Sequence, residues 1–271
     1  MKSKTNTGKD FQLSIGIFLL GVIIVFLIGF ALSRPIAIDI DMDHRIEPPS
    51  ATYLLGTDEL GRDLLSSILC GAGISLLIGT AAVILSALTG GLLGMISGLS
   101  GGVVDSIIMR LVDIFLAFPG ILLAIAVAAF FSQGILNLIL VLTISGWAGY
   151  ARITRGEVLK YKQHEFILAA RSYNASFARI MFHHLLPLIL PLLVVQASMG
   201  ISGVIIAESS LNFLGIGLDP EIPTLGQLID AGRDYMFDNP TLIVAPGLVL
   251  FIIIIAFNFI GEGLRKKSQI L

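Results

Sequence analysis

Six long stretches of this 271-residue chain carry almost nothing but apolar and small side chains. A helix needs roughly 20 apolar residues, at about 1.5 Å each, to cross a hydrocarbon core about 30 Å thick. Since the bilayer core offers no water to backbone N–H and C=O groups, spanning segments of this kind must be helices. We therefore predict an all-α integral membrane protein, with spans at about 11–33, 68–96, 107–131, 135–153, 185–206 and 242–260.

The composition supports this prediction and excludes other classes. Hydrophobic residues make up 55% of the chain and charged residues only 13%, against about 25% charged in ordinary soluble domains. The formal net charge of −2 offers no basic face for nucleic acid. The single cysteine, Cys70, cannot form an internal disulfide. No G-x-x-x-x-G-K-S/T loop occurs, and the adjacent His183 and His184 point to different helix faces, so we predict neither a P-loop ATP site nor a metal site.

Lysine and arginine set the expected orientation. If the N-terminus is cytoplasmic, six spans return the C-terminus to the same side, and the outer segments hold only Arg34, Arg45, Arg62 and Arg233. Because cytoplasmic loops are enriched in these residues, we predict that both termini are cytoplasmic. The chain then divides into a tail, first span and outer loop (1–67), a core of five spans (68–265) with a cytoplasmic loop at about 154–184, and a short tail (266–271).

The cytoplasmic loop carries a periodic apolar pattern. Phe166, Ala170, Tyr173 and Phe177 are spaced by four, three and four residues, which predicts that they line one face of a short helix. A narrow apolar face in this place fits a groove on another protein. An amphipathic helix that lies on the lipid surface fits the same periodicity, so both interpretations stay open at this point.

The end of this loop helix is also marked in the sequence. Asn174 follows the periodic segment, and asparagine tolerates the left-handed backbone conformation that terminates many helices. Ser176 is placed to cap the next helix, which leads into the fifth span. We therefore predict a helix, a stop at Asn174 and a new helix after Ser176.

The same loop resembles a known motif. Ala169-Ala170, Asn174 and Leu186-Pro187 are similar to the EAA loop of ABC-importer permeases, with Leu168 in place of the family's Glu and His184 in place of its Ile. Asn174 stands where the family has Gly, and the left-handed conformation explains why asparagine is the mildest replacement there.

Two further segments resemble one branch of that family. Residues 55–63 read LGTDELGRD, similar to the LGTDxxGRD motif that follows the first span in the C-type permeases of oligopeptide, dipeptide and nickel importers. Residues 210–217 read SLNFLGIG and, with Pro220 and Pro223, are similar to a second stretch of the same family. The resemblance covers about 55–265 and implies the type I ABC importer permease fold with about six transmembrane helices.

The resemblance also implies a function. It is that of a permease subunit, itself not an enzyme, in an ATP-driven importer of di- or oligopeptides in the bacterial cytoplasmic (inner) membrane. Its partners would be a second permease subunit, two ABC ATPase subunits that bind the ATP and Mg²⁺, an extracytoplasmic solute-binding protein, and membrane lipid; this chain would bind no cofactor. The coupling surface toward the ATPases would comprise Phe166, Ala169, Ala170, Arg171, Tyr173, Asn174, Phe177 and Pro187.

Other functions stay open from the residues alone. Nickel or another chelated metal is the alternative cargo for the same machinery. A secondary transporter or a non-transporting membrane subunit is the alternative of a different class, although a secondary transporter needs coupling groups inside the membrane, and the spans offer almost none besides Glu208.

The outer-loop motif allows a physical interpretation, with six candidate site residues: Gly56, Thr57, Asp58, Gly61, Arg62 and Asp63. Thr57 is a suitable N-cap, and Asp58 and Glu59 would then lie in the first turn, where the helix dipole favours negative charge. Asp58 and Arg62 are four residues apart and can pair. We expect a surface helix that closes the outer end of the bundle; direct contact with the cargo is the alternative.

Glu208 is the carboxylate inside the apolar stretch of the fifth span. A charge of this kind at the bilayer centre costs about 2.5–3.5 kcal/mol on translocon scales, so Glu208 should face protein or water. It either lines the translocation path or pairs structurally near the outer interface.

Overall fold

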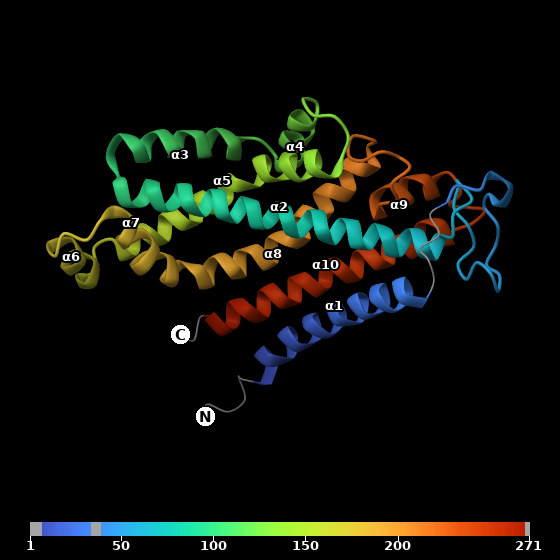
Figure 1. Cartoon of the computed structure of the whole chain (residues 1–271), viewed down its shortest axis with the longest axis horizontal. Coiled ribbons are helices and arrows are strands. Elements are labelled where there is room, and N and C mark those ends of the chain that lie inside the picture. The colour runs from blue at the N-terminus through green and yellow to red at the C-terminus, as the bar shows by residue number, and fades with distance from the viewer. Residues whose placement is uncertain (1–6, 34–38, 269–271) are drawn as a thin grey trace.

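The computed structural model describes residues 7–33 and 39–268, and helices make up most of these residues. Figure 1 shows long helices that run side by side, with short elements at both ends of the bundle. The elements in chain order are α1 (Thr7–Ser33), η1 (Met42–His44), α2 (Leu64–Ser100), α3 (Gly102–Ala117), α4 (Gly120–Ala128), α5 (Ile135–Tyr161), α6 (Glu165–Ser172), α7 (Phe177–Arg179), η2 (Ile180–Leu185), α8 (Leu186–Phe213), α9 (Leu225–Arg233) and α10 (Thr241–Ser268).

The predicted membrane bundle is confirmed. Within the described residues, four helices are long and apolar enough to cross a bilayer: α2, α5, the continuous α7–η2–α8 helix (Phe177–Phe213) and α10. The pair α3 and α4 together passes the same test, and α1 carries a shorter apolar stretch at Gln12–Phe26. Helix boundaries follow the hydropathy closely, but α5 continues to Tyr161 and the fifth span begins at Phe177, so much of the predicted loop at 154–184 is helix that extends the spans.

The third span differs from the prediction of one continuous helix. The chain bends by 96° between α3 and α4, at Phe118-Pro119. Phe118 is extended, with φ −94° and ψ 143°, because the ring of a following proline disfavours the helical conformation at the residue before it. The apolar stretch is therefore two helices that meet at a sharp bend.

Close packing of α2 against α5 depends on three glycines of α2. A Cβ atom on Gly90 would lie 2.8 Å from Tyr150 Cβ, and one on Gly94 would lie 2.8 Å from Thr154 Cβ. Four residues further along α2, a Cβ atom on Gly98 would lie 2.8 Å from Val158 Cβ of α5. Small residues at every fourth position let two membrane helices approach closely, so this glycine row brings α5 onto α2.

The two ends of the bundle carry different elements. Figure 1 shows α6 at one end, and α9 with the loop at 39–63 at the other. The first turn of α1 and the last turn of α10, which lie side by side, both point toward the end that carries α6. The two terminal helices thus share a side, and the assignment of that side to the cytoplasm stays a prediction.

Candidate functional site

One buried side chain packs α6 against the end of the helical bundle. Ile167 is 0% exposed and belongs to an apolar cluster that includes Leu99 of α2, Val158 of α5 and Ile189 of α8. The periodic pattern in the sequence missed Ile167, because it lies between the apolar residues Phe166 and Leu168 and off the predicted stripe. A run of three apolar residues is the signal that one of them faces the bundle.

The predicted apolar stripe on α6 is wrong in its extent. The helix ends at Ser172, so that Phe177 belongs to the next helix, α7. The other members are exposed to different degrees: Phe166 is 42% exposed and Tyr173 is 87% exposed, whereas Ala170 is half-buried. Ala169 and Arg171 are exposed beside them. The outward side of α6 is therefore an apolar and basic surface that nothing in the described part of the chain (7–33 and 39–268) covers.

The end of α6 follows the prediction for Asn174. Its φ is +55°, the left-handed conformation. Asn174 N–H donates to Arg171 O at 2.9 Å, and Ala175 N–H donates to Ala170 O at 3.0 Å. These two bonds form a Schellman motif, which satisfies the last carbonyls of the helix. The backbone therefore fixes where α6 stops and in which direction the chain leaves it.

The chain then enters the fifth span without a further break. Ser176 Oγ accepts a hydrogen bond from Arg179 N–H at 3.3 Å, so the predicted cap is confirmed. Residues 180–185 form a π-helix that ends just before the exposed Pro187. Pro187 has no N–H, so it cannot make the helical hydrogen bond to the carbonyl four residues before it. Single π-helical turns inside α-helices are frequent at functional sites. α7, η2 and α8 thus form one continuous helix that begins shortly after the turn at Asn174.

The outer motif is a compact loop, not the expected surface helix. Gly56 and Gly61 have φ of +83° and +74°. A Cβ atom on Gly56 would overlap Glu47 O, and one on Gly61 would overlap Asp41 O. The two glycines therefore let residues 56–61 lie directly against residues 41–47, and their left-handed backbone prevents a helix between them.

Thr57 does not cap a helix, which corrects the prediction. Its buried hydroxyl donates to His44 O at 2.5 Å and accepts from Glu47 N–H at 2.7 Å. Asp63 caps α2 instead, and its carboxylate accepts from Ser66 N–H at 3.0 Å. Thr57 thus holds the loop together, and Asp63 caps the start of α2.

The predicted pair of Asp58 and Arg62 is confirmed and is buried. The two residues are 2% and 5% exposed, and Arg62 Nε donates to Asp58 Oδ2 at 2.7 Å. Asp58 Oδ1 also accepts from the N–H groups of Leu60 and Arg62, both at 2.9 Å. Arg62 Nη1 donates to Glu221 O at 3.1 Å. The pair therefore joins the outer loop to the segment before α9.

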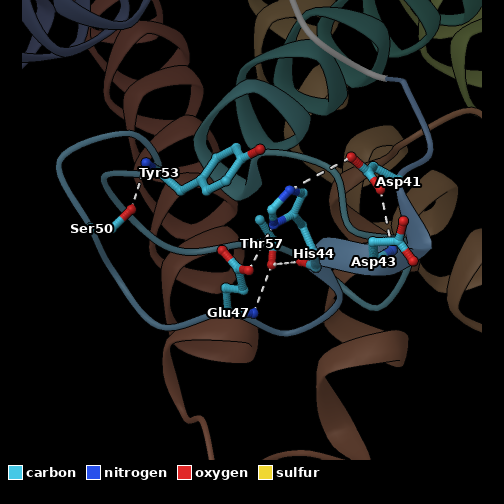
Figure 2. Close-up of polar contacts among 7 residues, drawn as sticks. All are labelled: Asp41, Asp43, His44, Glu47, Ser50, Tyr53 and Thr57. Atoms are coloured by element: carbon cyan, nitrogen blue, oxygen red, sulfur yellow. Dashed lines mark hydrogen bonds and ion pairs between the residues drawn. The ribbon is translucent and has the colours of Figure 1, made fainter.

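The same loop also holds an exposed cluster of charged side chains around His44. Figure 2 shows the His44 ring between acidic side chains: its Nδ1 lies 2.7 Å from Glu47 Oε1 and its Nε2 lies 3.9 Å from Asp41 Oδ2. The hydrogen bond to Glu47 raises the pKa of His44 above its ordinary value, and the charges of Glu47, Asp41 and Asp43 add to this effect. Sequence reasoning did not single out His44, although its acidic neighbours Asp41, Asp43 and Glu47 are visible in the sequence.

Glu208 lies inside the protein in α8. It is 0% exposed, and its carboxylate accepts hydrogen bonds from Ser75 Oγ of α2 at 2.9 Å, Ser209 Oγ at 3.2 Å and Asn212 Nδ2 at 2.5 Å. Three donors offset much of the penalty for burying a carboxylate. Of the two roles that the sequence left open, this arrangement favours the structural one. As for metals, no group of three or more His, Cys, Asp or Glu side chains is placed to hold an ion in the part of the chain that the structure describes.

The helical bundle has the fold of an ABC transporter subunit in the membrane. It matches a chain of the inward-facing MetNI methionine ABC transporter with a TM-score of 0.62 and 20% identity, over 77% of this chain and 98% of that chain. A second crystal form of the same transporter gives a TM-score of 0.57 at 21% identity, over 77% and 96%. The predicted fold class is thus confirmed.

Sequence comparison assigns the family. A family profile described as "Binding-protein-dependent transport system inner membrane component" matches residues 90–268, and the chain belongs to this family. It is similar to the dipeptide transport system permease protein of Haemophilus influenzae, with 41% identity over 81% of this chain and 74% of that protein. The glutathione transport system permease protein of Pectobacterium atrosepticum is 41% identical, over 83% of this chain and 75% of that protein. The di/tripeptide transport system permease protein of Pseudomonas aeruginosa is 39% identical, over 82% of this chain and 76% of that protein.

Proposed function

We propose that this chain is one permease half of an importer that brings peptides of a few residues across the inner membrane. Three relatives named for dipeptide, di/tripeptide or glutathione transport support peptide cargo. The single observation that carries the role in an ATP-driven machine is α6: a short helix at one end of the bundle, held by Ile167 and leaving Tyr173 uncovered.

In this proposal α6 docks into a groove on an ABC ATPase subunit. Two such subunits bind the ATP and Mg²⁺ and hydrolyse the nucleotide, while this chain holds no nucleotide and catalyses no reaction. Coupling requires that α6 binds two states of the ATPase with different free energies, because a partner shifts an equilibrium only by its differential affinity. The continuous helix from Phe177 to Phe213 then carries the displacement into the membrane.

The remaining partners follow the same arrangement. A second permease subunit would form the other half of the translocation path, and an extracytoplasmic solute-binding protein would deliver the cargo to the end that carries α9 and residues 39–63. Exposed acidic side chains at that end, such as Asp219 and Asp238, together with the basic side chains near α6, support a cytoplasmic position for α6.

A charge on the docking face tests the coupling. In the reconstituted complex, Tyr173→Asp should lower ATP-driven uptake roughly tenfold or more, since a buried aromatic anchor commonly contributes over 1.4 kcal/mol to an interface. Ala170→Asp should act in the same direction. Ser106→Asp is the matched control, because it adds the same charge to an exposed position of α3, outside α6 and outside the outer loop, and should leave uptake unchanged. Normal uptake and normal ATPase stimulation by Tyr173→Asp would contradict the docking of α6.

Cargo is tested separately. Proteoliposomes that contain the full complex are offered a labelled dipeptide, labelled glutathione and nickel, with a non-hydrolysable ATP analogue as the control. We expect ATP-dependent accumulation of the dipeptide or of glutathione. Accumulation of nickel with neither peptide would overturn the proposed cargo, and would leave the permease role intact.

A further inference from the structure

The buried amide of Asn212 connects Glu208 to the segment that follows α8. Asn212 is 1% exposed; its Oδ1 accepts from Leu218 N–H at 2.8 Å and its Nδ2 donates to Glu208 Oε1 at 2.5 Å. The backbone N–H of Leu218 can only donate, so it fixes which end of the amide faces outward. Nδ2 must then point at Glu208, and a carboxylate is a suitable acceptor for it.

The segment that Asn212 reaches is shaped to receive it. A Cβ atom on Gly217 would overlap the Asn212 side-chain oxygen, so the absence of a side chain at 217 makes room for the amide. The chain turns there after α8, with Gly215 at φ +70° and a Schellman pair of bonds from Gly215 N–H to Asn212 O and from Ile216 N–H to Leu211 O. The backbone of residues 214–218 thus folds back over the end of α8.

Other side chains hold the same outer segment by its backbone. Gln227 Nε2 of α9 donates to Leu218 O at 3.0 Å and to Asp219 O at 3.2 Å. Arg62 Nη1 donates to Glu221 O at 3.1 Å. Gln227 and Arg62 hold the segment from the side of α9 and the outer loop, whereas Glu208 and Asn212 hold it from α8. The hydrogen bond from Ser75 Oγ to Glu208 extends this hold to α2.

We propose that Glu208 is a positioning residue: through Asn212 it locks residues 214–224 onto the α2–α8 pair, so that this outer segment moves together with the two helices during transport. That the segment moves during transport rests on the proposed permease function. The hydrogen bonds that hold the segment are a property of this chain alone. Ser75, Glu208, Asn212 and Leu218 form one continuous path of hydrogen bonds from α2 to the buried part of the segment that follows α8.

The chemistry of the pair suggests a test by exchange of partners. Asn212→Asp keeps an acceptor for Leu218 N–H but replaces the Nδ2 donor by a second carboxylate, so at a pH high enough to ionise both carboxylates it should break the lock. Glu208→Gln keeps an acceptor for Asn212 and can donate to Ser75 Oγ, so it should preserve the lock. The double variant Glu208→Gln with Asn212→Asp restores one donor and one acceptor in reversed order, and should rescue the single Asn212→Asp variant.

The measurement is amide hydrogen exchange of residues 214–222 in the purified full complex, with uptake measured in parallel. We expect Asn212→Asp to speed exchange at Leu218 about tenfold, equivalent to about 1.4 kcal/mol, and the double variant to return it to within about threefold of wild type. Ser210→Ala is the matched control: Ser210 Oγ bonds back to Ile206 O of its own helix at 2.7 Å and should change nothing. Asn212→Ala, which introduces no charge, is the second variant if Asn212→Asp does not fold.

Three results would overturn the proposal. The first is unchanged exchange in both Asn212→Asp and Asn212→Ala. The second is a double variant that exchanges as fast as the single one. The third is Glu208→Gln with normal exchange but no uptake, since the carboxylate would then act on the cargo path itself. Absence of peptide uptake in the wild-type complex would contradict the proposed function instead, because the exchange measurement does not depend on cargo.

Discussion

Replacing Arg62 by methionine should destabilise the outer end of the protein by about 4 kcal/mol. Removing one partner of a buried ion pair typically costs about 3–5 kcal/mol, because the other charge stays buried. Asp58 keeps two backbone N–H donors, so the cost of leaving its charge without Arg62 is near the lower end of this range. The Glu221 carbonyl also loses its donor from Arg62, which adds about 1 kcal/mol.

Thermal unfolding of the purified complex measures this effect. At about 2 °C per kcal/mol for a chain of this size, the apparent midpoint of this subunit should fall by about 8 °C. Arg45→Met is the matched control in the same loop, since the exposed Arg45 donates to Tyr235 Oη at 3.0 Å and such surface contacts contribute less than about 1 kcal/mol. Equal shifts for the two variants would refute the reasoning.

A second variant separates charge from packing. Asp58→Asn keeps the acceptor for the two backbone N–H groups and removes the orphaned charge. Added to Arg62→Met, it should recover about half of the lost stability, because the remaining penalty is then mainly lost packing and the unpaired Glu221 carbonyl. A double variant that is less stable than Arg62→Met alone would show that the buried charge is not the source of the loss.

Three further perturbations test other parts of the structure. Gly94→Ala should cost about 1–3 kcal/mol by crowding Thr154 of α5, whereas Gly73→Ala, with no atom within 4 Å of its added Cβ, should be neutral in the same unfolding assay. Asn174→Ala should weaken the end of α6 by about 1 kcal/mol and Asn174→Gly should not, because the φ of +55° disfavours alanine; amide exchange at Ala175 measures this. The folded-state pKa of His44 is raised above 6.5, so its contact with Glu47 stabilises the outer loop fully below pH 6.5, and this stabilisation is lost as the pH rises through the folded-state pKa. In an NMR titration, the pKa of His44 should fall when Glu47 is replaced by glutamine. An unchanged pKa of His44 in Glu47→Gln would contradict the assigned cause.

The membrane helices could be predicted because hydropathy alone requires them. Long apolar segments have one stable arrangement in a bilayer, so the helical class and most span positions follow from composition along the chain. The bend between α3 and α4 did not follow, because a hydropathy window counts Phe118 and Pro119 as ordinary apolar residues. The backbone restriction that proline imposes on its predecessor is a local effect that an average over 20 residues hides.

The outer motif shows a different limit. The spacing of Asp58 and Arg62 correctly predicts a pair, but four-residue spacing also occurs in a tight loop, and the helix inferred from it was wrong. The information that decides between them is in Gly56 and Gly61, whose left-handed backbone serves contacts with residues 41–47. Those contacts, and the bond from Arg62 to Glu221, join segments far apart in the sequence, and no local pattern reports them.

The two ends of the protein are stabilised in opposite ways, and this difference fits their proposed roles. At the outer end, the buried polar groups of Thr57 and Arg62 bond to backbone atoms of other segments, so each is held by several directional contacts. At the other end, α6 depends on one buried side chain, Ile167, and on a Schellman turn at Asn174. An element with few buried contacts has a low local stability. In the proposed mechanism α6 can therefore follow a moving partner, whereas the outer loop would stay fixed to the helices that such a partner displaces.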